Sequence, residues 1–162
     1  MSEPGLSGQA QAARRIDQAA AGIALRVLGE EVTSELRTRM RQLPMRLRGS
    51  GLAATYAFVL SKADPQGEQL ARAYHRLAEQ VASHVANQGL LSGTGRQMAP
   101  LRFLQALGEA SVHDYARVSV EVEMLAVWLS RLAEALCEDK NSGEGSGGGN
   151  GEGGGARGAA EA

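Results

Sequence analysis

Apolar residues recur at steps of three and four along the stretch from Val112 to Leu136. This spacing returns side chains to one face of a helix, whereas a strand requires strict alternation. Ser111, directly before the stretch, is the expected N-cap, and Asp114 stands at the reciprocal position of a capping-box variant. Trp128 lies beside the stripe. The stripe consists of Val112, Tyr115, Val118, Val122, Leu125, Leu129, Leu132 and Leu136.

The same helical period runs through residues 9–43, but there it forms two offset stripes. The change from one stripe to the other falls near the Gly-Glu-Glu sequence at 29–31. This pattern leaves two alternatives: one long helix with a shifted buried face, or two helices with a bend between them. The stripes consist of Ile16, Ala20, Ile23 and Val27, and of Leu25, Leu28, Val32, Leu36, Met40 and Leu43.

Pro44 is expected to break the helix that precedes it, because proline lacks an N–H and clashes with the preceding turn. Proline is best placed at the first position of a helix, so residues 44–51 predict a short helical turn on a new axis. Glycine can adopt the left-handed conformation that ends a helix, which suits Gly49 or Gly51. The predicted structural corner therefore consists of Leu43, Pro44, Gly51 and Leu52.

Further helical stripes cover residues 52–59 and 70–85, and Pro100 opens a shorter helix. Aromatic residues make up only 4% of the chain, so the core must rest on Leu, Val and Ala. Such a core is typical of helices packed on helices, since sheets favour β-branched and aromatic residues. We therefore predict an all-α fold, a compact bundle of five to six helices.

The chain of 162 residues suits one domain, which we place at residues 9–138. Residues 1–8 carry Gly, Ser and Pro and are expected to be flexible. Residues 139–162 form a Gly-rich tail, with ten glycines after position 140 and few apolar side chains to bury. We expect this tail to be disordered and to serve solubility or tethering.

No arrangement of residues in the sequence predicts catalysis, a metal or a cofactor. The histidines His75, His84 and His113 form no metal-binding motif. Glu109 and His113 are four residues apart, but a new helix is expected to start between them, so they are not expected to form a ligand pair on one helix face. The single cysteine, Cys137, has no histidine beside it and is expected to be an inert thiol in a reducing compartment. No signal peptide or apolar run of membrane length is evident, so we expect a cytoplasmic protein without a membrane partner.

Five arginines stand within twelve residues, with no acidic residue among them. The planar guanidinium fork suits phosphate, and two short axes that meet at a corner would present a curved cationic surface. The alternative from composition alone is an ordinary solvated helix face. Residues 1–62 carry a net charge of +4, from nine basic against five acidic side chains, and residues 63–140 carry −3, from seven against ten. The five are Arg37, Arg39, Arg41, Arg46 and Arg48.

Two blocks of the sequence resemble the small α-helical subunit of the type III-B CRISPR effector complexes, the Cmr complexes. The first block has Leu-Pro, a further Leu, Gly-Leu and an apolar helix that ends in Lys. The second has a Tyr at the start of a helix and a Trp-Leu-x-Arg motif before Ala-Glu. The resemblance covers residues 14–137, and it departs at Ser50, where the family often has Asn, and in the Gly-rich tail. The matching residues are Leu43, Pro44, Leu47, Gly51, Leu52, Phe58 and Lys62, then Tyr115, Trp128, Leu129, Arg131, Ala133 and Glu134.

The resemblance implies a subunit without nuclease activity, whose copies stack head to tail as a minor filament. Its implied partners are a guide RNA paired with target RNA, the backbone and large subunits of the Cmr complex, and copies of itself. The implied role is contact with the target RNA backbone. The alternative is a helical protein–protein adaptor whose basic corner docks an acidic partner. The residues expected to contact RNA are Arg41, Arg46 and Arg48, followed by Arg37, Arg39 and Lys62.

Overall fold

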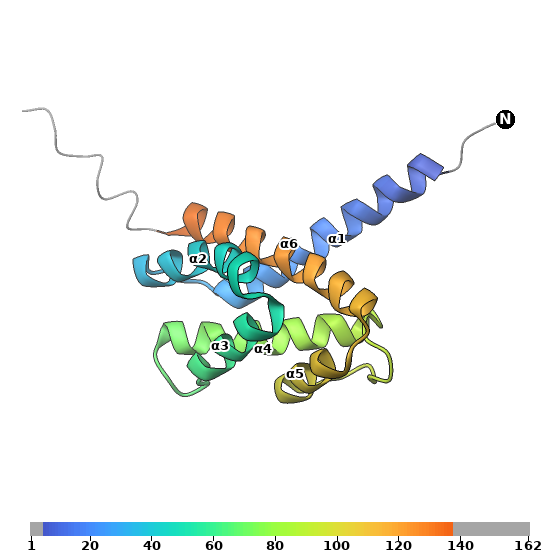
Figure 1. Ribbon diagram of the computed structural model, residues 1–162. Helices are drawn as coiled ribbons and strands as arrows, with labels where there is room; N and C mark the ends of the chain where they lie inside the picture. The colour runs from blue at the N-terminus through green and yellow to red at the C-terminus, as the bar shows by residue number, and fades with distance from the viewer. Residues whose placement is uncertain (1–4, 138–162) are drawn as a thin grey trace, which may run out of the picture.

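The computed structural model describes residues 5–137, and all regular secondary structure within them is α-helical (Figure 1). The all-α prediction is therefore confirmed. Residues 1–4 of the predicted flexible N-terminus and the whole of the predicted Gly-rich tail, residues 139–162, lie outside the described range. The helices are α1 (Gly5–Leu28), α2 (Ser34–Ser50), α3 (Leu52–Lys62), α4 (Gln69–Asn87), α5 (Pro100–Glu109) and α6 (Val112–Leu136).

The long helix α6 packs along both α1 and α2, while α4 packs against α1 and α3 (Figure 1). The short α5 lies beside α3 and α4. Helix α1 begins at Gly5, earlier than the start near residue 9 that the apolar pattern predicts. Its N-terminal half extends away from the other helices, and residues 8–15 are exposed.

The two stripes of residues 9–43 belong to two separate helices. Helix α1 ends at Leu28, and Gly29 follows with a φ of 73°, a conformation that glycine adopts without strain. The Thr33 side chain then caps α2 by accepting a hydrogen bond from the Leu36 N–H at 3.3 Å. Arg76 of α4 donates to the Val27 carbonyl at 2.9 Å, which supplies a partner to an end of α1 that lacks intrahelical donors.

Pro44 does not end the helix that precedes it, contrary to our prediction. Helix α2 runs through Pro44 to Ser50, and the turn comes at Gly51, whose φ is 81°. An interior proline loses one backbone hydrogen bond and costs about 3 kcal/mol. Burial of one continuous apolar stripe across the proline outweighs this cost. The buried stripe consists of Leu36, Met40, Leu43 and Leu47.

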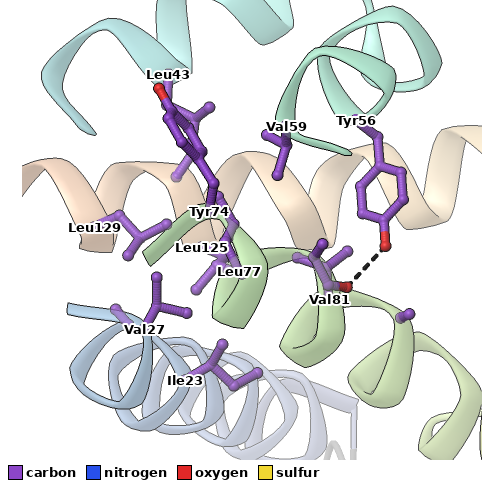
Figure 2. Packing of buried hydrophobic residues seen from close by; sticks show 14 of the residues in the cluster. Ile23, Val27, Leu43, Tyr56, Val59, Tyr74, Leu77, Val81, Leu125 and Leu129 are labelled. Atoms are coloured by element: carbon purple, nitrogen blue, oxygen red, sulfur yellow. Dashed lines mark hydrogen bonds between the residues drawn. The ribbon is translucent and has the colours of Figure 1, made fainter. Parts of the chain in front are cut away.

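The core lies where α1, α4 and α6 meet beneath α2 and α3. Ile23 of α1, Leu77 of α4 and Leu125 of α6 converge there (Figure 2). Tyr56 of α3 donates its hydroxyl to the Ala78 carbonyl at 2.7 Å, and its ring meets Phe103 edge-on at 4.6 Å between centroids. Burial raises the pKa of Tyr56, because the phenolate would lose its hydration there. The few aromatic residues thus fasten α3, α4 and α5 together.

Helix α6 starts as the sequence predicts. Ser111 is the N-cap, and its hydroxyl accepts a hydrogen bond from the Asp114 N–H at 3.1 Å. The Tyr115 hydroxyl, one turn further, accepts a hydrogen bond from the Ala53 N–H at 3.0 Å. This contact joins the start of α6 to the start of α3, directly after the turn at Gly51.

Candidate nucleic-acid interface

The continuity of α2 through Pro44 decides where its arginines lie. On a single helix, residues seven apart return to nearly the same face. Arg39 and Arg46 therefore form one row, and Arg41 and Arg48 form another. The expected start of a new helix at Pro44, with Arg46 and Arg48 on it, is wrong, because α2 is continuous from Ser34 to Ser50.

The row with Arg39 and Arg46 lines a groove of about 380 Å³ between α2, α3 and α4. Lys62, at the last turn of α3, adds a third cation to the same groove. Arg39 and Lys62 are exposed, while Arg46 is half-buried. No acidic side chain stands among the six residues that line it, so the groove is cationic. The lining consists of Arg39, Arg46, Phe58, Lys62, Leu70 and Tyr74.

Aromatic contacts hold Arg46 in place within the groove. Its guanidinium carbon lies 4.0 Å from the centroid of the Phe58 ring, which is a cation–π contact. The Phe58 ring in turn meets Tyr74 edge-on, with centroids 6.0 Å apart and planes at 88°. Burial raises the pKa of Tyr74, and the positive charges of Arg39 and Arg46 oppose that rise. The negative charge of Glu35 adds to the rise in the pKa of Tyr74, so charges of both signs act on this wall of the groove.

Two further predicted residues face α6 instead. Arg37 and Arg41 approach the same carboxylate oxygen of Glu134, with N–O distances of 4.0 and 3.9 Å. Arg37 is half-buried, whereas Arg41 is exposed. These two arginines thus help to join α2 to α6, and their charge is partly offset by Glu134.

Arg48 lies beside a different groove, of about 390 Å³, between α1, α2 and α6. Trp128 forms part of its wall and donates its indole N–H to the Asp17 carboxylate at 2.8 Å. Trp128 also packs against the core and is half-buried. Charges of both signs line this groove, since Asp17 and Glu123 accompany Arg48 and Arg131.

The six predicted RNA-contacting residues therefore separate into three places. Only Arg39, Arg46 and Lys62 come together around one groove. Neither Phe58 nor Tyr74 was among the residues predicted to contact RNA. Phe58 belongs to the sequence block that resembles the family, whereas Tyr74 lies outside both blocks. The seven-residue spacing of Arg39 and Arg46 could have revealed their shared row. Tyr74 comes from a different helix, and no local signal places it beside them.

The remaining titratable groups do not gather into a metal site within residues 5–137. No group of three or more His, Cys, Asp or Glu side chains there is placed to hold a metal ion. His84 meets Glu121 at 3.0 Å across α4 and α6, and His75 pairs with Glu79 within α4 at 3.4 Å. Cys137 is buried. In this same part of the chain, no helix has the length and apolar character needed to cross a membrane.

Comparison with known proteins identifies the family of this helical bundle. The family model described as CRISPR-associated protein (Cas_Cmr5) matches residues 9–136. The chain therefore belongs to the Cmr5 family of CRISPR-associated proteins, which confirms the resemblance to the small subunit of the type III-B Cmr complexes.

The solved structures agree with this assignment. The X-ray crystal structure of a CRISPR-associated Cmr5 family protein from Thermus thermophilus is similar with a TM-score of 0.52 and 26% sequence identity. The match covers 76% of this chain and 98% of that chain. None of the curated proteins matches.

Proposed function

We propose that the protein is a non-catalytic subunit of a type III-B CRISPR ribonucleoprotein, and that its cationic groove contacts the backbone of RNA. Membership of the Cmr5 family supports the first part. The second part rests on one observation: Arg39, Arg46 and Lys62, from two helices, surround a groove without an acidic side chain in its lining. Such a concentration of positive charge attracts a polyanion.

The chemistry of the groove suits phosphate groups. Guanidinium groups donate paired hydrogen bonds to phosphate oxygens, and the Lys62 ammonium adds a point charge. Contacts of this kind carry no sequence information, which is appropriate where a guide RNA reads the target by base pairing. The target RNA of a guide–target pair is therefore the ligand that we assign to the groove.

The other cations receive a secondary role in this proposal. Arg37 and Arg41 share Glu134, and Arg48 lies with Arg131 beside two acidic residues. They contribute to the general positive field of α2, so their substitution should weaken RNA binding less than substitution in the groove. The remaining partners that we propose are the backbone and large subunits of the Cmr complex, and further copies of this chain in a minor filament in the cytoplasm.

The test compares two double charge reversals that change the net charge equally. Arg39→Glu with Arg46→Glu alters the groove, and Arg102→Glu with Arg117→Glu alters exposed arginines of α5 and α6. Binding of a labelled single-stranded RNA is measured over a range of salt concentrations, with circular dichroism to verify folding. The groove variant should lose affinity, and its log–log salt slope should fall by about 1.4, since each single-strand contact contributes about 0.7.

Equal binding by the two variants would contradict the assignment of the groove. If neither variant nor the unaltered chain binds RNA, and one protein co-purifies in a fixed ratio, the chain is an adaptor whose basic surface docks an acidic partner.

A further inference from the structure

The groove has an apolar side that phosphate binding does not require. Phe58, Leu70 and Tyr74 form this side, and the cations Arg39, Arg46 and Lys62 complete the lining. We infer that the groove receives an unpaired nucleobase, which stacks on the guanidinium of Arg46, together with the phosphates on either side of that nucleotide. This inference rests on the proposed function, because it specifies which part of the RNA enters the groove.

The contact between Arg46 and Phe58 orients a flat surface for stacking. The guanidinium is planar, and its carbon lies 4.0 Å from the centre of the ring. The guanidinium carbon lies over the Phe58 ring, so stacking requires a flat ligand to meet the side of the guanidinium that Phe58 does not cover. Bases in single-stranded RNA stack on arginine planes as well as on aromatic rings.

The support beneath Arg46 is rigid. Phe58 packs against the core, and its ring is held edge-on by the buried Tyr74. An exposed arginine would lose conformational freedom when it binds a base, whereas Arg46 is already confined by the ring below it. The groove volume of about 380 Å³ also lies within the range of about 300–1,000 Å³ that is usual for small-ligand pockets.

The exposed cations lie where the neighbouring phosphates would pass. Arg39 belongs to α2 and Lys62 to α3, and both line the groove that holds Arg46. A base that enters between them brings one phosphate before it and one after it within reach of a cation. A base within a duplex is already stacked and paired, so the nucleotide that enters the groove is one of the target RNA that is not paired with the guide.

The test separates stacking from charge by conservative substitution. Arg46→Lys keeps the positive charge and removes the plane, and Arg39→Lys is the matched control at an exposed cation of the same groove. Phe58→Leu keeps an apolar wall and removes the ring beneath the guanidinium. Each full-length variant is titrated with three probes: single-stranded RNA, the same RNA with abasic positions, and inorganic polyphosphate. Thermal unfolding verifies that each variant is folded.

The unaltered chain should bind intact RNA about tenfold more tightly than abasic RNA, the size expected for one stacked base. Phe58→Leu should abolish this preference while binding of polyphosphate stays within about twofold, and Arg46→Lys should abolish the preference as well. Arg39→Lys should retain the preference.

Equal binding of intact and abasic RNA by the unaltered chain would overturn the stacking inference and leave phosphate binding in place. Loss of the preference in Arg39→Lys to the same degree as in Arg46→Lys would also overturn it, because the effect would then not require the plane over Phe58. Failure of the unaltered chain to bind either RNA, with tight binding of an acidic peptide instead, would overturn the proposed function and this inference together.

Discussion

The Tyr115 hydroxyl accepts a hydrogen bond from the Ala53 N–H at 3.0 Å, across 62 positions of the chain. The first N–H groups of a helix have no intrahelical partner, and Gly51, which precedes α3, has no side chain that could cap it. Tyr115 therefore acts as the cap of α3 from a distant helix. It also links the two sequence blocks that resemble the Cmr small subunit, since Gly51 belongs to one and Tyr115 to the other.

Replacing Tyr115 with Phe should lower the free energy of unfolding by about 1–2 kcal/mol, because a partly buried N–H loses its acceptor. Urea denaturation measures this change. Ser119→Ala is the control, since that hydroxyl only donates back to the Tyr115 carbonyl within α6 and its loss should cost less than about 0.5 kcal/mol. Equal effects of the two substitutions would contradict the capping role.

Replacing Pro44 with Ala should stabilise the protein by about 1–3 kcal/mol. Pro44 stands inside α2, where alanine restores the backbone N–H and the preceding turn relaxes. Part of the gain is offset because Pro44 also lines the groove beside Trp128. Thermal unfolding should show a higher midpoint. A lower midpoint would mean that the packing of the proline ring, and not the backbone of the helix, dominates at this position.

Replacing Thr55 with Val should also stabilise the protein, by about 1–3 kcal/mol. Thr55 is only 3% exposed, and its hydroxyl has no hydrogen-bond partner within the described residues. It lines a cavity of about 20 Å³ among apolar side chains of α2, α3, α4 and α6. Valine has nearly the same shape and carries no polar atom to desolvate.

Chemical denaturation tests the Thr55 prediction. Thr38→Val on the exposed face of α2 is the control, and it should change the free energy of unfolding by less than about 0.5 kcal/mol. A destabilised Thr55→Val variant would show that the hydroxyl is satisfied in solution, for instance by a water molecule in the cavity.

The stability of the protein should fall as the pH rises above about 10, in part because of Tyr56. Burial raises the pKa of Tyr56 in the folded state above the ordinary value of 10.0. Above that value the unfolded chain releases the proton while the folded chain keeps it, so folding becomes less favourable by about 1.4 kcal/mol per pH unit. The contribution of protonated Tyr56 to the stability of the folded state is fully present below pH 10 and is lost as the pH rises above this value.

Tyr56→Phe provides the comparison for this pH dependence. At pH 7 the variant should be less stable by about 1–2 kcal/mol, because the Ala78 carbonyl loses its donor. At pH 11 the difference should narrow, since phenylalanine does not ionise. Tyr74, whose pKa burial also raises, is present in both chains and adds the same slope to each. Parallel pH profiles would contradict the role of Tyr56.

Local signals in the sequence were sufficient for most of the helices. The stripe of α6 and its Ser111 cap follow from a period and a capping preference that depend only on near neighbours. The prediction that Pro44 would break the helix was wrong. It considered the hydrogen bond that proline loses, but not the burial of Met40, Leu43 and Leu47 around it. The sequence left open whether residues 9–43 form one helix or two. In the structure, the positive φ of Gly29 and the hydrogen bond from Arg76 to the end of α1 separate two helices.

The sequence by itself determined that the chain is all-α, that it carries a concentrated set of arginines, and that it resembles the Cmr small subunit. Only the tertiary structure decided that Arg39 and Arg46 join Lys62 and Tyr74, while Arg37 and Arg41 turn to Glu134. Helical periodicity fixes the angle of each side chain about its own axis. Which helix it then meets depends on how the apolar faces of six helices pack, and that is set by contacts between residues far apart in the chain.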